Sequence, residues 1–179
     1  MKFSFSCRSL LLASAAAVIL TGCATPADRG AMTPQNLNIA KHHPYSLQVQ
    51  TGGGSGTGAM ESSNIADADL KAAIEDAVKQ SKLFKSIVQG NGGDYELSVN
   101  VTSLSKPMFG GTFTVDMETA WTLTKVSDRS VALRKAVQSS GTATMGEAFA
   151  GVTRLRLAVE KAASENISKG LRAIAELNL

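Results

Sequence analysis

Two long stretches in which apolar and polar residues alternate constrain the fold of this chain more than any other feature. The first covers residues 95–102, and the second continues for about twelve residues from Phe113. Successive side chains of a strand point to opposite faces of a sheet, so each stretch predicts a strand with one buried and one solvated face. The predicted buried positions are Tyr95, Leu97, Val99 and Val101 in the first strand, and Phe113, Val115, Met117, Trp121 and Leu123 in the second.

Shorter patterns predict the rest of the sheet. Residues 45–51 alternate in the same way and predict the first strand. Leu83, Phe84, Ile87 and Val88 lead into Gly90-Asn91-Gly92-Gly93, which is a strong signal for a hairpin. The turn residues 127–130 lead into a last strand through Val131, Leu133 and Val137, which fades near Gly141.

Two segments carry apolar residues at helical spacing. Residues 66–80 form the first, and Asp67 and Asp69 lie at its start, where the helix dipole favours anions. Residues 152–177 form the second, in which Gly170 costs about 1 kcal/mol relative to alanine. The apolar stripe of this second helix is predicted to contain Val152, Leu155, Val159, Ala162, Ala163, Ile167, Leu171, Ile174 and Leu177, with Arg154 and Glu160 off it.

The predicted order of elements is β-α-β-β-β-β-α. Because the helices flank a run of strands and can share one face of the sheet, this order predicts an α+β fold, a two-layer sandwich. We expect a mostly antiparallel sheet of about four to five strands packed by two helices. Residues 45–179 are expected to form a single domain.

The N-terminus has the organisation of a secretory signal. Lys2 and Arg8 supply positive charge, residues 10–20 are apolar, and Leu20, Thr21 and Gly22 precede Cys23 in the order of a lipobox. Cleavage before Cys23 would leave a cysteine that carries a diacylglycerol and a third acyl chain, which is a near-permanent membrane anchor. Two alternatives are a transmembrane helix, which needs about 20 apolar residues, and an ordinary signal peptide with a chance cysteine.

This interpretation divides the chain into three parts. Residues 1–22 are predicted to be a lipoprotein signal peptide, and residues 23–44 the lipidated cysteine and a flexible tether rich in turn-forming residues. Ala24 stands where an aspartate commonly retains lipoproteins at the inner membrane of enteric bacteria. By resemblance to that sorting rule, we expect a lipid anchor in the outer membrane, with the domain on the periplasmic face.

Composition excludes several classes of function. Removal of residues 1–22, with Lys2 and Arg8, leaves 157 residues with 16 basic and 15 acidic side chains, so a nucleic-acid partner has little support. Cys7 lies in the predicted signal peptide and Cys23 would be consumed by lipid. A disulfide, a cysteine nucleophile and a thiolate metal site are therefore excluded if the lipobox is real.

One pattern resembles a known group of proteins. Leu70, Ile74 and Val78, then Ser81, Leu83 and Phe84, precede Asp94-Tyr95-Glu96-Leu97 and the strand that follows. Over roughly residues 45–137 this is similar to the auxiliary lipoproteins of ABC-type transport systems and to the lipopolysaccharide-assembly lipoprotein. Curli-secretion-like lipoproteins have a comparable pattern. The resemblance implies a non-catalytic partner of a transport or assembly machine, with no catalytic residue to carry over.

Two sequence patterns have the spacing of a cofactor site or of a nucleophile pair, but neither predicts such a site. Gly54-Ser55-Gly56-Thr57-Gly58-Ala59 fits the spacing of a dinucleotide fingerprint, but helical periodicity starts only near Ile65, so a flexible loop is favoured. Ser103-Leu104-Ser105-Lys106 has the spacing of a serine-lysine pair, but strand residues three apart face opposite sides. No catalytic residue and no cofactor are predicted.

Polar clusters are also explained without a ligand. His42 and His43 are predicted to be surface residues because a metal site needs three or four converging ligands. Asp67 and Asp69 lack the rest of a calcium loop. Asp116 and Glu118 share a strand face, which we interpret as solvated and paired across the hairpin with Arg134 or Lys135. Trp121 is expected in the core, with the wall of an apolar groove as the alternative.

The sequence therefore favours a non-enzymatic, outer-membrane-anchored lipoprotein that binds a protein partner or a lipid in envelope transport or assembly. An envelope hydrolase or transferase is the alternative from another class. A structural lipoprotein without a dedicated ligand is the third hypothesis. No metal is predicted.

Overall fold

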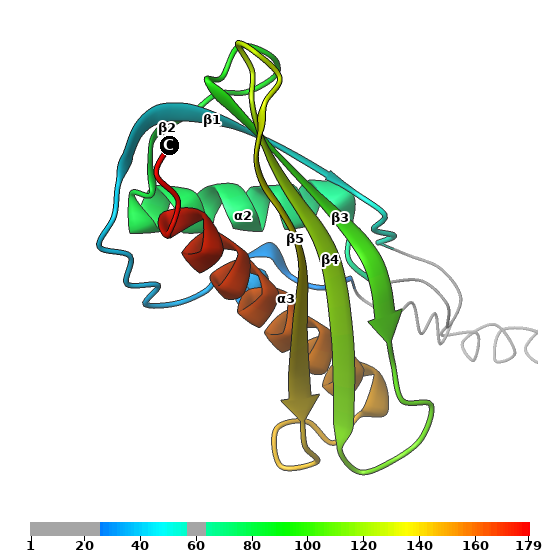
Figure 1. Cartoon of the computed structure of the whole chain (residues 1–179). Helices are drawn as coiled ribbons and strands as arrows, with labels where there is room; N and C mark the ends of the chain where they lie inside the picture. Colours follow the sequence, from blue (N-terminus) through cyan, green and yellow to red (C-terminus); the bar gives the residue numbers. More distant parts are fainter. Residues whose placement is uncertain (1–25, 57–63) are drawn as a thin grey trace, which may run out of the picture.

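The computed structural model describes residues 26–56 and 64–179. Its elements confirm the α+β class and the predicted order of five strands and two long helices (Figure 1). One short helix was not predicted. The elements are α1 Arg29–Met32, β1 His43–Gly52, α2 Asp67–Ser81, β2 Phe84–Ile87, β3 Tyr95–Ser105, β4 Phe113–Lys125, β5 Val131–Ala143 and α3 Gly151–Ala175.

The five strands form one mixed sheet in the order β2-β1-β3-β4-β5. β3, β4 and β5 are antiparallel neighbours, and the turn at 127–130 joins the last two as predicted. β1 runs parallel to both β2 and β3. The sheet is therefore antiparallel at one side and parallel at the other.

The hairpin predicted at residues 90–93 is wrong, because β2 and β3 lie on opposite sides of β1. β2 pairs with the first half of β1, up to Leu47, and β3 pairs with the second half, from Leu47 on. The connecting chain crosses the β1 backbone at this point. A side chain at Gly93 would come within 2.9 Å of the Gln48 amide nitrogen, so the crossing requires glycine there.

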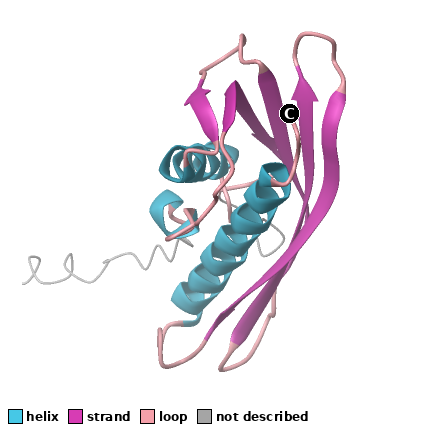
Figure 2. Cartoon of the chain, turned by 60° about the vertical axis from the view of Figure 1, so that its left-hand side comes forward, coloured by secondary structure: helices cyan, strands magenta, loops and turns pink. Residues whose placement is uncertain are grey.

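The helices cover one face of the sheet (Figure 2). The alternation in β4 is confirmed, since its predicted core positions are buried, and Thr119 lies buried among them. Trp121 is completely buried and belongs to the core. The stripe on α3 is confirmed over most of its length, but Val152 is exposed, while Arg154 and Glu160 are buried.

Trp121 is tied to α3 by a polar network and by a close packing contact. The Thr119 hydroxyl donates to Asn166 Oδ1 at 2.6 Å, and the Trp121 indole nitrogen donates to Thr119 Oγ1 at 2.8 Å. Asn166 in turn donates to the carbonyl oxygen of Val137 on β5. The indole ring lies against Gly170, where a Cβ atom would come within 2.4 Å of the ring.

The flexible tether predicted for residues 23–44 is not what the structure shows from Ala27 onward. Ala27 and Met32 are buried, and α1 packs on α2 and α3. The Ala27 amide donates to the Asn64 carbonyl oxygen, and the Asp28 amide donates to Glu160 Oε1 at 2.9 Å. This part of the chain folds onto the helices because its few apolar residues cover their outer side. Cys23 and the predicted signal peptide lie outside the described residues.

Within residues 26–56 and 64–179, no helix is both long enough and apolar enough to cross a membrane.

The contact at Gly170 gives a test of the packing. Gly170→Ala should reduce the free energy of unfolding by about 2 kcal/mol, because the new methyl group overlaps the Trp121 ring and overpacking outweighs the gain in helix propensity. Urea unfolding followed by circular dichroism measures the change. Gly146→Ala, where the nearest atom would be 3.7 Å away, is the control and should change stability little. Equal or greater stability of Gly170→Ala would contradict the packing described.

Candidate functional site

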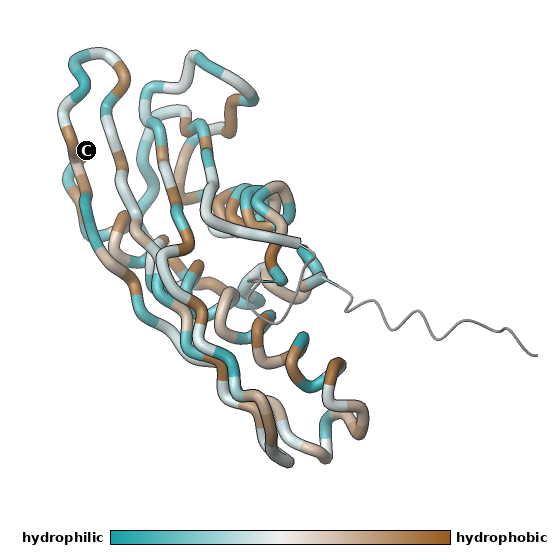
Figure 3. The backbone as a smooth tube through the Cα atoms, turned by 90° about the vertical axis from the view of Figure 1, so that its right-hand side faces the viewer, coloured by the Kyte–Doolittle hydropathy of each residue, from teal (hydrophilic) through white to brown (hydrophobic). Residues whose placement is uncertain are grey.

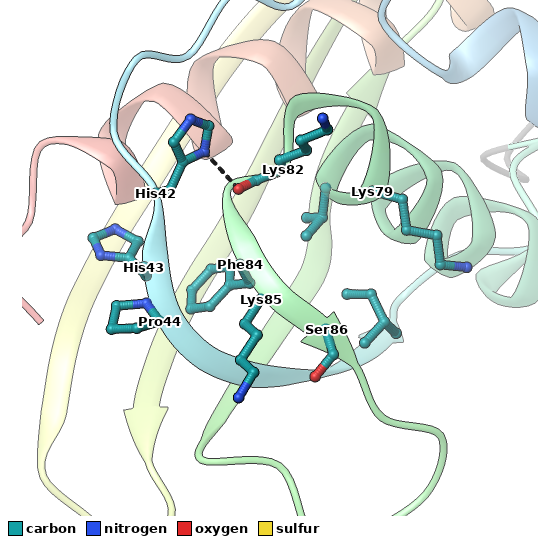
Figure 4. Close-up of a pocket in the computed structure, with 10 residues that line it drawn as sticks. His42, His43, Pro44, Lys79, Lys82, Phe84, Lys85 and Ser86 are labelled. Carbon is teal, nitrogen blue, oxygen red and sulfur yellow. Dashed lines mark hydrogen bonds between the residues drawn. The ribbon is translucent and has the colours of Figure 1, made fainter.

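A groove of about 670 Å³ runs along β2 at the edge of the sheet (Figure 4). Three segments line it: the start of β1, the C-terminal turn of α2 and β2 itself. The lining residues are His42, His43, Pro44, Val78, Lys79, Lys82, Phe84, Lys85, Ser86 and Ile87.

The end of α2 gives the groove its shape. Lys82 adopts a left-handed conformation with φ 53°, which stops the helix and turns the chain directly into β2. The Lys82 carbonyl oxygen lies 2.7 Å from His42 Nδ1, and the His43 amide donates to the Leu83 carbonyl oxygen at 2.7 Å. These bonds join the segment before β1 to the segment before β2, so the two walls of the groove are fixed relative to each other.

His43 forms the buried corner of the site. It was predicted to be a surface residue, but it is 3% exposed, whereas its neighbour His42 is exposed as predicted. Its Nε2 lies 3.2 Å from the carbonyl oxygen of Ile174 in α3, and its ring packs against Phe84 at 5.3 Å between centroids. Burial lowers the pKa of His43, and the nearby Lys41 and His42 lower it further, against the opposing effect of the Ile174 carbonyl. His43 is thus a neutral packing residue at neutral pH.

The rim of the groove is cationic. Lys79 and Lys82 come from the end of α2 and Lys85 from β2, and their side chains spread around the β2 ribbon (Figure 4). Among the described residues, the lining contains no carboxylate. Asp94 is within electrostatic reach of Lys85, and its pKa is lowered mainly by hydrogen bonds from Ser46 and further by Lys85. The partly exposed Ile87 gives the same groove an apolar component, and the buried Phe84 and Val78 line it from the core side.

β2 also offers backbone groups. Among the strands of the described chain, β2 pairs with β1 alone, so its second edge faces away from the sheet. An unpaired strand edge presents a row of N–H and C=O groups that can bind another extended chain. The groove therefore combines three features: a strand edge, a cationic rim and apolar side chains.

The serine-lysine and dinucleotide patterns do not assemble a site. Ser103 and Ser105 are exposed residues of β3, which ends before Lys106. Gly54 donates its amide to Asp67 Oδ1 at 2.8 Å, so the acid at the start of α2 holds this loop. This carboxylate places a negative charge beside the glycines, where a phosphate would have to approach. Residues 57–59 of the dinucleotide pattern lie outside the described residues. In the described part of the chain, no three acidic, histidine or cysteine side chains gather as metal ligands would.

The ion pair expected across the last hairpin is wrong. Glu118 lies opposite Gln138 and accepts a hydrogen bond from its amide at 2.8 Å, and Asp116 lies opposite Ser140. Arg134 and Lys135 lie opposite Thr122 and Trp121 instead. The hairpin register places the two charged sets several residues apart along the strands.

The cationic groove was missed from the sequence. Lys79, Lys82 and Lys85 do recur every three residues, but the spacing spans the end of a helix and the start of a strand. His42 and His43 come from a segment about forty residues earlier. The sequence does predict the end of this helix and the first strand. The lysines and the histidines come together only through the parallel pairing of β1 with β2, which the sequence does not predict.

Comparison with known proteins identifies the fold. No model of a protein family matches the sequence, and no curated protein matches it. Solved structures do match in shape. A protein of the family DUF330 from Xanthomonas campestris aligns with a TM-score of 0.57 at 16% identity, over 80% of this chain and 90% of that one.

Two further structures share the architecture. A candidate lipoprotein from Caulobacter crescentus aligns with a TM-score of 0.51 at 17% identity, over 72% of this chain and 87% of that one. A hypothetical protein from Chlamydia trachomatis aligns with a TM-score of 0.50 at 5% identity, over 74% of this chain and 94% of that one. The chain thus has a fold that occurs in other bacterial proteins.

The buried imidazole predicts a pH dependence of stability. Because the pKa of His43 is lower in the folded protein than in the unfolded chain, its contribution is complete above about pH 6.5 and is lost as the pH falls toward the lowered value. His43→Gln keeps a donor for the Ile174 carbonyl but cannot be protonated. Its free energy of unfolding should vary less between pH 7 and pH 5, values on either side of the ordinary histidine pKa of about 6.5.

Urea titrations at several pH values make the measurement, with His42→Gln as the matched control at the exposed neighbour. An unchanged pH dependence in His43→Gln would show that this imidazole is not the group responsible.

Proposed function

We propose that this protein is a non-enzymatic lipoprotein of the outer membrane, facing the periplasm, that binds an extended acidic segment of a protein partner in envelope transport or assembly. The observation that carries the proposal is the groove along β2, where an open strand edge lies among three lysines. The lipid anchor rests on Cys23 and the lipobox before it.

The groove fits an added strand better than a compact ligand. A partner strand beside β2 would satisfy the outward backbone groups of residues 84–87, which supply affinity with little dependence on sequence. The lysines of the rim would then select acidic side chains and raise the association rate. The partly exposed Ile87 would contact an apolar residue of the partner.

Two findings support the envelope location. The resemblance to transport-auxiliary and assembly lipoproteins covers the segment that forms α2, β2 and β3, which includes most of the groove. The candidate lipoprotein of Caulobacter crescentus has the same fold. A lipid with an anionic headgroup is the second candidate ligand, favoured by the partly exposed Ile87 beside the lysines.

Charge reversal tests the groove. In cells that produce the full chain, the photoreactive residue p-benzoylphenylalanine at Ser86 should form a discrete adduct with a protein on irradiation. The combined substitutions Lys79→Glu, Lys82→Glu and Lys85→Glu should reduce the adduct by about tenfold or more, since three rim charges each contribute up to about 1 kcal/mol and tenfold corresponds to 1.4 kcal/mol. Gel shift and mass spectrometry of the adduct provide the readout.

The matched control changes the net charge equally at the other edge of the sheet, through Arg134→Glu, Lys135→Glu and Arg172→Glu, and should leave the adduct intact. An adduct with lipid in place of protein would support the second candidate and overturn the first. No adduct, or equal loss in both triple variants, would also contradict a protein partner at β2.

The anchor has its own test. Cys23→Ala removes the thiol that would carry the lipid, so the variant should leave the membrane fraction as an unprocessed precursor or a soluble form. Fractionation with a carbonate wash, followed by immunoblotting, measures the distribution. A variant that stays with washed membranes as completely as the unaltered protein would refute lipid anchoring at this residue.

A further inference from the structure

Large apolar side chains are exposed at one end of the molecule, where the β3–β4 and β5–α3 loops meet (Figure 1). Phe109 is 87% exposed, Phe149 86% and Val152 69%, and Met108 and Met145 are also exposed. The two loops touch, since a side chain on Gly111 would come within 3.1 Å of Met145 Sδ. We call Met108, Phe109, Met145, Phe149 and Val152 the apolar tip. Figure 3 shows the two loops at the end of the sheet and of α3.

The apolar tip is held in shape by a buried arginine. Arg154, in the first turn of α3, donates from Nη1 to the carbonyl oxygens of Ala148 and Phe149 at 3.0 and 2.6 Å. Its Nη2 donates to the Gly110 carbonyl oxygen at 3.3 Å, and the guanidinium lies 5.0 Å from the centroid of the Phe113 ring. One cation thus fixes both loops. Phe109 and Phe149 point into solvent from a built scaffold, and such a cluster marks an interaction surface.

The charge of the two loops suits a membrane surface. Glu147 is the one acidic residue in the segments 106–112 and 144–150, and it forms an ion pair and a hydrogen bond with Lys161. Burying the apolar tip in a bilayer interface therefore requires no uncompensated carboxylate to leave water.

The length of chain between the lipid anchor and the folded domain brings the bilayer close. Cys23 precedes Pro26 by three residues, which reach at most about 11 Å when fully extended. From there the chain is fixed, because Asp28 is bonded to Glu160 in α3. Glu160 lies nine residues from Gly151, or about 14 Å along the helix, so the anchor and the apolar tip can meet the same bilayer.

We infer that the apolar tip inserts into the interface of the bilayer that holds the lipid anchor, and so fixes the orientation of the domain on the membrane. The inference rests on the lipid anchor of the proposed function. Two Phe and two Met side chains, with Val152, would exchange water for the headgroup and upper acyl region. The groove along β2 does not take part in this contact.

A fluorescent label on the lipidated chain tests the inference. With Cys23 lipidated, the mature chain has no free thiol, so Phe109→Cys and Phe149→Cys each provide one site for the environment-sensitive dye NBD. The lipidated protein is reconstituted at one copy per nanodisc of phosphatidylethanolamine and phosphatidylglycerol. Both labels should emit at shorter wavelength than in water and lose intensity when nitroxide-bearing lipids are included. Ser127→Cys, exposed in the turn at the opposite end, is the control and should show neither effect.

The other outcomes separate the possible failures. If the unaltered protein does not co-purify with nanodiscs, the lipid anchor fails and the inference fails with it. If the protein co-purifies but labels at 109 and 149 behave like the label at 127, the anchor stands and the apolar tip does not touch the bilayer. A shift seen only when two copies share one disc would assign the apolar tip to contacts between copies and overturn the inference.

Discussion

The contact between Trp121 and α3 is the constraint on which the structure depends. Trp121 lies flat against Gly170, and its indole nitrogen ends in the hydrogen-bond network of Thr119 and Asn166. A larger residue at 170 would push the helix away from β4, and the loss of Asn166 would leave buried donors without partners. Because β4 is also paired on both sides, this contact sets the position of α3 over the sheet. A second close approach, between Gly141 of β5 and the α3 backbone at Ala158 and Ala162, fixes the same helix from the neighbouring strand.

The positions of α3 and α2 then determine where the groove along β2 lies. α3 carries Ile174, which holds His43 and thereby the start of β1. α2 ends in the left-handed Lys82, which starts β2 and holds His42. These contacts hold the starts of the parallel strands β1 and β2 against the ends of α3 and α2. The cationic groove is a product of packing between elements distant in sequence.

Local periodicity was enough to predict the elements and the core, and it was not enough to predict how the chain is paired. The strand at β4 and the helix at α2 follow from alternation and helical spacing, which depend on neighbouring residues alone. The path from β2 to β3 depends on Gln48, which lies forty-five residues before Gly93. A glycine-rich turn has the same sequence pattern whether the two strands that it joins pair with each other or are separated by a third strand. Gly170 shows the same limit. Its low helix propensity predicts a loss of helix stability, whereas the close packing against the Trp121 ring requires a glycine at this position.

Polar residues were the other source of error. The sequence predicts Arg154 and Glu160 off the apolar stripe of α3, because charged side chains are seldom buried, yet both are buried and bond to the loops or the N-terminal segment. The segment from Ala27 lacks a period and so predicts a tether, although Ala27 and Met32 are buried and the Asp28 amide is bonded to α3. No pattern within these short stretches could reveal partners more than a hundred residues away, such as the bond from Asp28 to Glu160.

The docked segment changes how the domain would work at a membrane. A long flexible tether would let the domain face any direction, whereas a connection of three residues would hold it beside the bilayer in a restricted set of orientations. α3 would then act as a spacer between the membrane surface and the groove. The apolar tip lies at the first residues of α3, and Ile174, which supports the groove, lies 23 residues further along from Gly151, or about 35 Å. With the apolar tip at the bilayer, the open edge of β2 would stand well clear of the headgroups, where an extended segment of a periplasmic partner can reach it.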